Sequence, residues 1–375
     1  MSTAPDTPPG VAASNAALAP LRQQIDALDQ ELLSMLNRRA LLAEQVGEIK
    51  KKEGSPFFRP DRVAQLITSL QQKNPGPLRA EHVAAVWREV VSACLALESP
   101  IRIAYLGPAG TFSEQAAVQY FGSSIGRVPC ASFDEVFRAT SSGMAEFGVV
   151  PVENSTEGVV ARTLDLLLTS PLHIVGEVSL MVRHNLLRLS NSLDGIEVVC
   201  AHPQALAQCH QWLSTHLPHA ERRAVSSNAE GARLATENPA WAGIASLKAG
   251  TEFGLHSVAH GIQDVAVNRT RFAVVCLPAV LDLPPPSGDD RVSLVVSVPN
   301  RSGALHDLLV PLKKHGVSMT RFESRPAKSG QWDYYFYIDL QGHPQEPHVA
   351  AALAELEQYC AFCKILGTHA ISRDV

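Results

Sequence analysis

The chain has 375 residues, of which 46% are hydrophobic and 18% are charged, and its formal net charge is -5. This length is enough for several domains, and the mildly acidic charge argues against a nucleic-acid partner. No apolar run approaches the ~20 residues of a membrane-spanning helix, and the N-terminal segment lacks the basic and apolar parts of a secretory signal. Seven scattered cysteines fit a reducing compartment better than a disulfide framework, so we expect a cytoplasmic protein.

The N-terminal part of the chain predicts an all-helical domain over residues 16–99, preceded by a disordered lead-in over residues 1–15 that is rich in Pro, Ala, Ser and Thr. One long helix is expected over 16–52, and two shorter helices over about 61–73 and 80–98. Apolar residues of the long helix follow each other in alternating steps of four and three, which predicts a seam facing another helix. These residues are Leu21, Ile25, Leu28, Leu32, Met35, Leu42, Val46 and Ile49.

Arg39 occupies the position of this seam at which a leucine would be expected. Removing a guanidinium from water costs several kcal/mol unless the charge is paired. Either a small anionic ligand between helices pairs with Arg39, or the side chain reaches water at the edge of the bundle. Lys50 shares the face of Arg39 within roughly 20°, whereas Arg22 points about 100° away and would suit a second copy of the site in a dimer.

Residues 21–50 and the RPDR segment at 59–62 resemble the all-helical chorismate mutases. The resemblance implies that Arg39, together with Arg22 from a second copy, holds the carboxylates of chorismate. It also implies that Lys50 reaches a carboxylate and the ether oxygen, and that Glu98 contacts the same oxygen. The rearrangement to prephenate needs only a folded substrate and stabilisation of negative charge on the ether oxygen, and fixed cations in a dry pocket supply both.

Two positions depart from that family. Val63 stands where relatives often carry a Glu that binds the substrate hydroxyl, which leaves open a weakened mutase or another ligand for the hydroxyl. Glu98 stands where Gln is common, and an ionised carboxylate would repel the ether oxygen, so mutase activity is expected to fall as pH rises. Arg59 and Cys94 are expected to line the pocket through backbone contacts.

The pattern changes at Pro100, where short apolar runs and helical stretches begin to alternate, which predicts an α/β domain over residues 100–280. Four polar clusters follow strands or precede helices in this region. They are 105–113, 151–158, 201–205 and 268–272. Each cluster alone is more often a helix cap than a binding site, but four of them together suggest one cleft between two lobes.

The motifs GPAGTFS, PVENS, HPQALAQC and TRF in these clusters resemble prephenate dehydratase, in the order of that family. The resemblance implies two lobes like those of periplasmic binding proteins, with Thr270 at the centre of catalysis, Arg271 as the cation for the carboxylates and Phe272 shaping the site. Decarboxylation of prephenate with loss of its ring hydroxyl gives phenylpyruvate, and the Thr270 hydroxyl can donate a hydrogen to the leaving hydroxide. No cofactor and no metal are expected. The other expected lining residues are Thr111, Ser113, Glu153, Asn154, Ser155, Gln204 and His202, the last of which could instead cap a helix.

A proline-rich linker is expected over residues 281–290, followed by a βαββαβ pattern over 291–375 that predicts a ferredoxin-like α+β domain. GAL and ESRP motifs in this part resemble ACT regulatory domains of the phenylalanine-binding kind. The motif residues are Gly303, Ala304, Leu305, Glu323, Ser324, Arg325 and Pro326. The resemblance implies inhibition by L-phenylalanine, while a dimerisation module without a ligand is the alternative.

The three resemblances together imply a bifunctional enzyme of phenylalanine biosynthesis, with chorismate and prephenate as substrates, L-phenylalanine as effector, and a homodimer or higher oligomer as the assembly. One alternative keeps the dehydratase and its regulation but treats the helical domain as a weak mutase or a dimerisation device, because of Val63. Another is a non-enzymatic sensor, against which the intact TRF motif at 270–272 argues.

Overall fold

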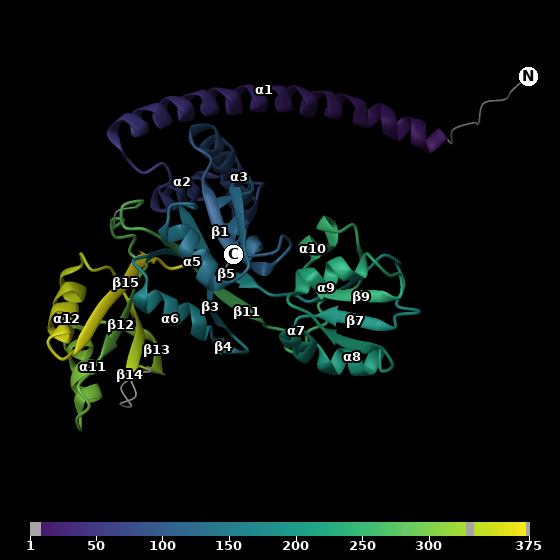
Figure 1. The fold of residues 1–375 in the computed structure, drawn as a ribbon. Coiled ribbons are helices and arrows are strands. Elements are labelled where there is room, and N and C mark those ends of the chain that lie inside the picture. Colours follow the sequence, from purple (N-terminus) through teal and green to yellow (C-terminus); the bar gives the residue numbers. More distant parts are fainter. Residues whose placement is uncertain (1–8, 282, 328–333, 373–375) are drawn as a thin grey trace, which may run out of the picture.

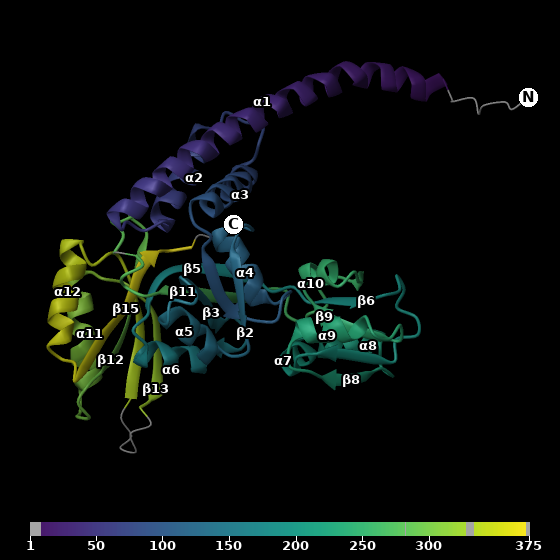
Figure 2. The ribbon, with the colours of Figure 1, turned by 45° about the horizontal axis from the view of Figure 1, so that its top comes forward.

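A computed structural model describes residues 9–281, 283–327 and 334–372 of the chain, with side chains described from residue 18 onward (Figure 1). Three helices form the N-terminal module, as expected: α1 (Pro9–Glu53), α2 (Pro60–Lys73) and α3 (Ala80–Glu98). The first helix begins at Pro9 instead of residue 16, so residues 9–15 of the expected lead-in are helical, and residues 1–8 lie outside the described part. The N-terminal half of α1 projects well beyond α2 and α3 in both views (Figures 1 and 2).

The α/β region forms two lobes, each built on one sheet. The elements of the larger lobe are β1 (Arg102–Leu106), α4 (Phe112–Phe121), β2 (Gly126–Cys130), α5 (Phe133–Ser141), β3 (Phe147–Asn154), β4 (Gly158–Val159), α6 (Ala161–Thr169), β5 (His173–Met181) and β11 (Arg269–Cys276). Its main strands lie in the order β5-β11-β3-β1-β2, with β11 antiparallel to both of its neighbours.

The chain leaves the larger lobe after β5, builds the smaller lobe, and returns in β11. The elements of the smaller lobe are β6 (Asn185–Arg188), β7 (Val198–Ala201), α7 (Pro203–Gln208), α8 (His210–His216), β8 (Glu221–Ala224), α9 (Asn228–Ala235), β9 (Trp241–Ala245), α10 (Leu247–Glu252) and β10 (His256–Ala259). Its strands lie in the order β10-β6-β9-β7-β8. Strand β3 ends, and strand β11 begins, at the edge of the larger sheet nearest the smaller lobe. The polar residues at these two strand ends therefore face the boundary between the lobes.

The C-terminal module has the expected βαββαβ order. Its elements are β12 (Asp290–Ser297), α11 (Ala304–His315), β13 (Met319–Pro326), β14 (Tyr334–Gln341), α12 (Pro347–Glu357) and β15 (Phe362–Ala370). Strand β15 meets β5 in parallel at Gly367 and Ile174, so the sheet of this module continues the sheet of the larger lobe. A Cβ atom on Gly367 would lie 2.0 Å from the Ile174 carbonyl oxygen, so the close approach requires glycine here.

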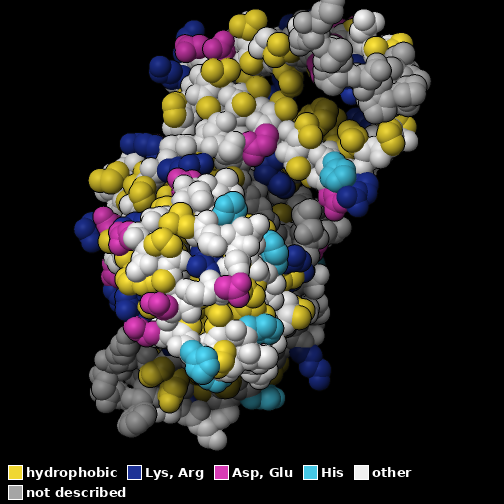
Figure 3. Space-filling view, turned by 90° about the vertical axis from the view of Figure 1, so that its right-hand side faces the viewer, with side chains coloured by type: hydrophobic (Ala, Val, Ile, Leu, Met, Phe, Trp, Pro, Cys, Tyr) yellow, Lys and Arg dark blue, Asp and Glu magenta, His cyan; other side chains and the backbone are white. Residues whose placement is uncertain are grey.

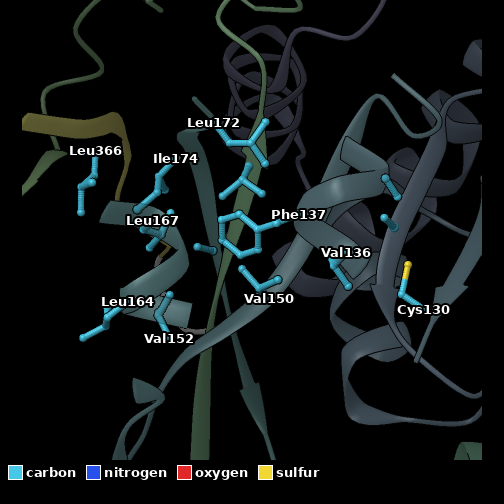
Figure 4. Close-up of a cluster of buried hydrophobic side chains, with 14 of the residues drawn as sticks. Cys130, Val136, Phe137, Val150, Val152, Leu164, Leu167, Leu172, Ile174 and Leu366 are labelled. Atoms are coloured by element: carbon cyan, nitrogen blue, oxygen red, sulfur yellow. The ribbon is translucent and has the colours of Figure 1, made fainter. Parts of the chain in front are cut away.

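Both flanking modules share hydrophobic core with the larger lobe. Leu366 of β15 belongs to the cluster that surrounds Phe137 and faces Leu167 of α6 (Figure 4). At the other side, Phe58 from the connection between α1 and α2 is 5% exposed and belongs to the core cluster that contains Phe147. The helical module and the C-terminal module therefore both pack against the larger lobe. None of the helices in the described part of the chain combines the length and the hydropathy that a membrane crossing requires.

Candidate functional site

The cationic site expected in the helical module lies at the end of α1. Lys50 Nζ donates a hydrogen bond to the Phe57 carbonyl oxygen at 2.8 Å and lies 3.4 Å from Glu98 Oε2 on α3. The close approach of α1 and α3 occurs at Gly47, where a Cβ atom would lie 3.0 Å from the Glu98 Cβ. Arg39, earlier on the same helix, is half-buried. The structure thus brings Lys50 and Glu98 together, as expected from the sequence.

The other residues expected at this site have different surroundings. Arg22 is exposed on α1. Arg59 makes a bidentate pair with Asp61, with Nε–Oδ1 and Nη2–Oδ2 distances of 3.0 and 2.8 Å. Val63 packs against a core cluster of the larger lobe, and Cys94 is buried within α3. The side chain of Val63 therefore contributes to the contact between modules, a role that the family comparison of this position did not predict.

The apolar seam of α1 faces solvent within this chain. The eight seam residues expected to contact another helix are between 46% and 61% exposed. Hydrophobic side chains accordingly gather at the top of the molecule in Figure 3, where α1 lies. A long, regular apolar stripe of this kind is typical of a surface that packs against another helix.

Asn154, the last residue of β3, organises the polar cluster between the lobes. Its Oδ1 accepts hydrogen bonds from the backbone N–H groups of Thr156 and Glu157 at 3.0 and 3.1 Å and from the Thr156 hydroxyl at 2.6 Å. Its Nδ2 donates to Asn268 Oδ1 and to Thr270 Oγ1, at 2.8 Å each. Three donors surround Asn154 Oδ1, so the Nδ2 group of this side chain must face Thr270. The Thr270 hydroxyl oxygen therefore accepts a hydrogen bond from Asn154 Nδ2. The hydroxyl proton of Thr270 is left to be donated to a bound molecule.

Gln208, at the end of α7, joins the smaller lobe to this cluster. Its Nε2 donates to Thr156 Oγ1 and Glu157 Oε1, at 3.0 Å each, and its Oε1 accepts from Asn268 Nδ2 at 3.0 Å. The sequence pointed instead to Gln204, one helical turn earlier, which is exposed. Both glutamines lie in the HPQALAQC motif. Gln208 follows Gln204 by four residues on the same helix face, and this spacing was the sequence feature that could have indicated it.

Two other expected ligand positions are helix caps. The Thr111 hydroxyl accepts a hydrogen bond from the Glu114 backbone N–H at 3.3 Å, and the buried Glu114 carboxylate accepts one from the Gly110 N–H at 2.7 Å. This reciprocal arrangement resembles a capping box. His202 caps α7, because its Nδ1 accepts from the Gln204 N–H at 3.3 Å. The capping alternative for His202 is therefore confirmed.

The Arg271 guanidinium is surrounded by carboxylates of the protein. Thr270 and Arg271 are consecutive on β11, so their side chains point to opposite faces of the sheet. The Arg271 guanidinium pairs with Asp339 of β14 at 2.9 Å and with Glu153 at 3.0 Å. Burial would lower the pKa of Arg271, but the carboxylates, Asp339 foremost, raise it above its usual value. The protein's own carboxylates thus match the charge of Arg271 in this structure, and its role as the cation for prephenate stays a prediction.

The remaining expected dehydratase residues have mixed roles. Phe272 is 2% exposed and belongs to a core cluster, so it supports the strand from within. Ser113 is buried at the start of α4. Ser155 lies next to β11, where its Oγ accepts a hydrogen bond from the Arg269 backbone N–H at 2.9 Å. Ser155 directly follows Asn154, which is paired with Thr270 in the strand register.

The GAL and ESRP motifs lie at the same end of the C-terminal sheet. Tyr335 of β14 faces Ser297 at the end of β12 and Arg325 at the end of β13. The loop that follows β12 leads into the GAL motif, so this loop and the ESRP strand end are neighbours. Gly303 adopts a left-handed conformation with φ of 78° at the start of α11. Arg325 pairs with Asp165 of α6 at 3.0 Å, which links the motif to the larger lobe.

Comparison with known proteins identifies all three modules. A chorismate mutase type II family model matches residues 21–99, a prephenate dehydratase model matches 103–279, and an ACT domain model matches 292–358. The bifunctional chorismate mutase/prephenate dehydratase of Stutzerimonas stutzeri is 44% identical over 358 residues, which cover 94% of this chain and 97% of that protein. The corresponding protein of Neisseria gonorrhoeae is 46% identical over 355 residues, with coverages of 94% and 96%.

A solved structure supports the fold of the last two modules. Prephenate dehydratase from Arthrobacter aurescens, in complex with L-Phe, has a TM-score of 0.66 at 34% identity, covering 72% of this chain and 90% of that chain. The expected fold classes of the three modules, one all-helical, one two-lobed α/β and one ferredoxin-like, are confirmed. The two bifunctional relatives match this chain over nearly their whole length, and the chain belongs to the bifunctional chorismate mutase/prephenate dehydratase family.

Proposed function

We propose how the residues of this chain divide the two reactions of its family. In the helical module, Arg39 and Lys50 hold the carboxylates and the ether oxygen of chorismate while the substrate rearranges to prephenate. The Lys50 ammonium has three donors, of which the Phe57 carbonyl and Glu98 take two, so one remains to stabilise charge on the ether oxygen. The Phe57 contact holds the lysine in place, which favours this geometry before the substrate arrives.

We propose that a second copy of the chain covers the exposed seam of α1 and supplies Arg22 to the mutase site. The seam carries the spacing of a helix–helix contact, and its residues are more than two-fifths exposed within one chain. Arg22 lies seventeen residues before Arg39, which corresponds to about 25 Å along the helix axis, too far to reach one small substrate within the same chain. A symmetric dimer would place the Arg22 of each copy near the other copy's Lys50.

Mixing two inactive variants tests this arrangement. Arg22→Ala and Lys50→Ala should each lose mutase activity as separate proteins. A dimer that contains one of each has one intact site if Arg22 acts across the interface, so subunit exchange should restore about a quarter of the wild-type activity. If ultracentrifugation shows dimers and the subunits exchange but no activity returns, Arg22 and Lys50 belong to the same site of one chain. A monomer by ultracentrifugation would contradict the dimer itself.

In the two-lobed domain, we propose that Thr270 assists the departure of hydroxide from prephenate. The carbon–carbon bond to the ring carboxylate breaks and releases carbon dioxide, its electron pair completes the aromatic ring, and the carbon–oxygen bond to the ring hydroxyl breaks. The Thr270 hydroxyl donates a hydrogen bond to the departing oxygen, which leaves as hydroxide and takes up a proton from solvent to become water. The observation that carries this role is the orientation of Asn154, whose amide donates to Thr270 Oγ1 and so directs the hydroxyl proton outward.

Assay of both activities on one purified sample tests the assignment of two functions. Chorismate should be consumed with formation of prephenate, and added prephenate should give phenylpyruvate with release of carbon dioxide. A sample that forms prephenate but does not consume it would leave only the mutase. A sample that consumes neither substrate would contradict the proposal as a whole.

We propose L-phenylalanine as the effector, bound where the GAL loop and the ESRP strand end lie together. Support comes from the intact motifs and from their position at one end of the sheet. Deleting residues 290–375 is not a clean test, because Leu366 and Tyr337 belong to a core cluster of the larger lobe. Gly303→Ala, which strains a left-handed residue, should weaken inhibition by L-phenylalanine while activity without effector stays near the wild-type value. Unchanged inhibition would place the effector elsewhere.

The cytoplasm is the compartment we propose, since all seven cysteines are free thiols.

A further inference from the structure

The catalytic strand β11 contacts two modules through two consecutive residues. Thr270 faces the polar cluster at the lobe boundary, where Asn154 holds its hydroxyl. Arg271, on the opposite face, reaches the C-terminal module, where its Nη1 donates to Asp339 Oδ2 at 2.9 Å. The backbone that orients the catalytic hydroxyl is therefore tied, one residue further along, to the module that carries the effector motifs.

Asp339 is built to hold this arginine. The side chain is 4% exposed, and its second oxygen, Oδ1, accepts a hydrogen bond from the Ser293 hydroxyl on β12 at 2.7 Å. Burial alone would raise the pKa of Asp339, but the nearby guanidinium groups of Arg271 and Arg321 lower it below its usual value. The carboxylate is therefore charged and has a fixed orientation. Strand pairing also places Asp339 directly opposite Ser293 and Arg321, in the middle of the sheet of its module.

The larger lobe contributes a second buried carboxylate to the same contact. Glu177 of β5 lies 3.5 Å from Arg271 and pairs with Arg291 of β12. The backbone N–H of Ser372, just after β15, donates to Glu177 Oε1 at 3.0 Å. The ion pairs cross the junction in both directions, with Arg271 reaching Asp339 and Arg291 reaching Glu177. A shift of the C-terminal module relative to β5 and β11 would have to break or rearrange both pairs.

We propose that Asp339 is a positioning residue for the dehydratase: by holding Arg271 it fixes β11 and the Thr270 hydroxyl, and it carries the state of the C-terminal module to the catalytic strand. This inference rests on the proposed role of Thr270. It explains why an arginine next to the catalytic threonine faces the C-terminal module instead of the polar cluster at the lobe boundary. It also assigns a function to an aspartate that lies outside every motif identified in the sequence.

Asp339→Asn tests the inference, because it keeps the shape of the side chain and the contact with Ser293 but removes the charge. We expect the dehydratase kcat to fall by about tenfold with KM within about twofold, since Asp339 contacts Arg271 on the face of β11 opposite to Thr270. The L-phenylalanine concentration for half-inhibition should rise at least several-fold. Mutase activity of the same sample should stay within about twofold of wild type, which shows that the chain is folded.

Lys364→Met is the matched control at the same junction. The Lys364 ammonium donates to the carbonyl oxygens of Leu167, Leu168 and Ser170 at 2.8, 3.0 and 2.6 Å, which ties β15 to the end of α6. It crosses between the same two modules without touching β11. Its loss should lower thermal stability but leave the dehydratase kcat and the half-inhibition concentration within about twofold.

The outcomes separate this inference from the proposed function. Wild-type kcat and wild-type inhibition in Asp339→Asn would overturn the inference, as would an equal loss in Lys364→Met, which would show a merely structural junction. If Asp339→Asn does not fold, Ser293→Ala keeps the charge but removes one restraint, and it should show the same changes to a smaller degree; no change would overturn the inference. A wild-type protein without dehydratase activity would instead contradict the proposed function.

Discussion

Phe58 provides a test of whether the helical module is part of the folded core of the dehydratase. It lies eight residues after Lys50, in the connection between α1 and α2. The centre of its ring is nevertheless 5.0 Å from the ring centre of Phe121 and 5.7 Å from that of Phe147. Replacing a fully buried Phe by Ala costs about 3–5 kcal/mol, because the apolar contacts are lost and a cavity remains. For domains of this size the change corresponds to a fall of roughly 10 °C in the midpoint of thermal unfolding.

Phe57→Ala is the control, since Phe57 is half-buried and lies outside the core clusters of the described residues. Its carbonyl oxygen, which accepts from Lys50, is kept in that variant. We expect Phe58→Ala to lower the unfolding midpoint at least twice as much as Phe57→Ala, and to speed amide hydrogen exchange in β1 and β3 in particular. It should also weaken the mutase, because the segment that holds Lys50 loses its anchor. Equal midpoints in the two variants, or unchanged exchange in β3, would refute this packing.

Three further predictions follow from the structure. Glu98→Gln should flatten the fall of mutase kcat/KM at rising pH, as measured by initial rates of chorismate loss, and an identical profile would remove Glu98 from the mechanism. Burial lowers the pKa of His184 and of His369 below the usual 6.5. Below that pH the unfolded chain therefore binds more protons than the folded chain does. The free energy of unfolding should therefore decrease below pH 6.5, by up to about 1.4 kcal/mol per pH unit for each histidine, and a flat series of urea titrations would contradict this. Gly367→Ala should destabilise the chain by about 1–3 kcal/mol, since the added methyl group overlaps the Ile174 carbonyl, and calorimetry showing no loss would argue against the sheet junction.

The sequence was most informative where a pattern is local. Helical periodicity predicted the three N-terminal helices, and the motif order predicted the modules that follow. Strand alternation also held the information that Thr270 and Arg271 face opposite sides. The resemblance assigned both residues to the substrate, and only the arrangement of the modules shows that Arg271 is matched by Asp339, 68 residues further along the chain.

Other features depend on contacts between distant segments and could not be predicted. Nothing local distinguishes Phe58 from its neighbour Phe57, although only Phe58 enters the core of the larger lobe. Gly367 lies in an otherwise ordinary strand, and its requirement for glycine arises from Ile174 in another module. The start of α1 at Pro9 was also missed, because its small residues and prolines are typical of disordered segments.

We propose that the two reactions take place at separate sites and that Thr270 serves only the second. Thr270→Ala and Thr270→Ser should be assayed for both activities in the same preparations, next to the wild-type protein. We predict that the alanine variant loses at least about a hundredfold in dehydratase kcat, that the serine variant keeps a substantial part of it, and that both retain mutase activity. Full dehydratase activity in Thr270→Ala, or a parallel loss of both activities, would contradict the account.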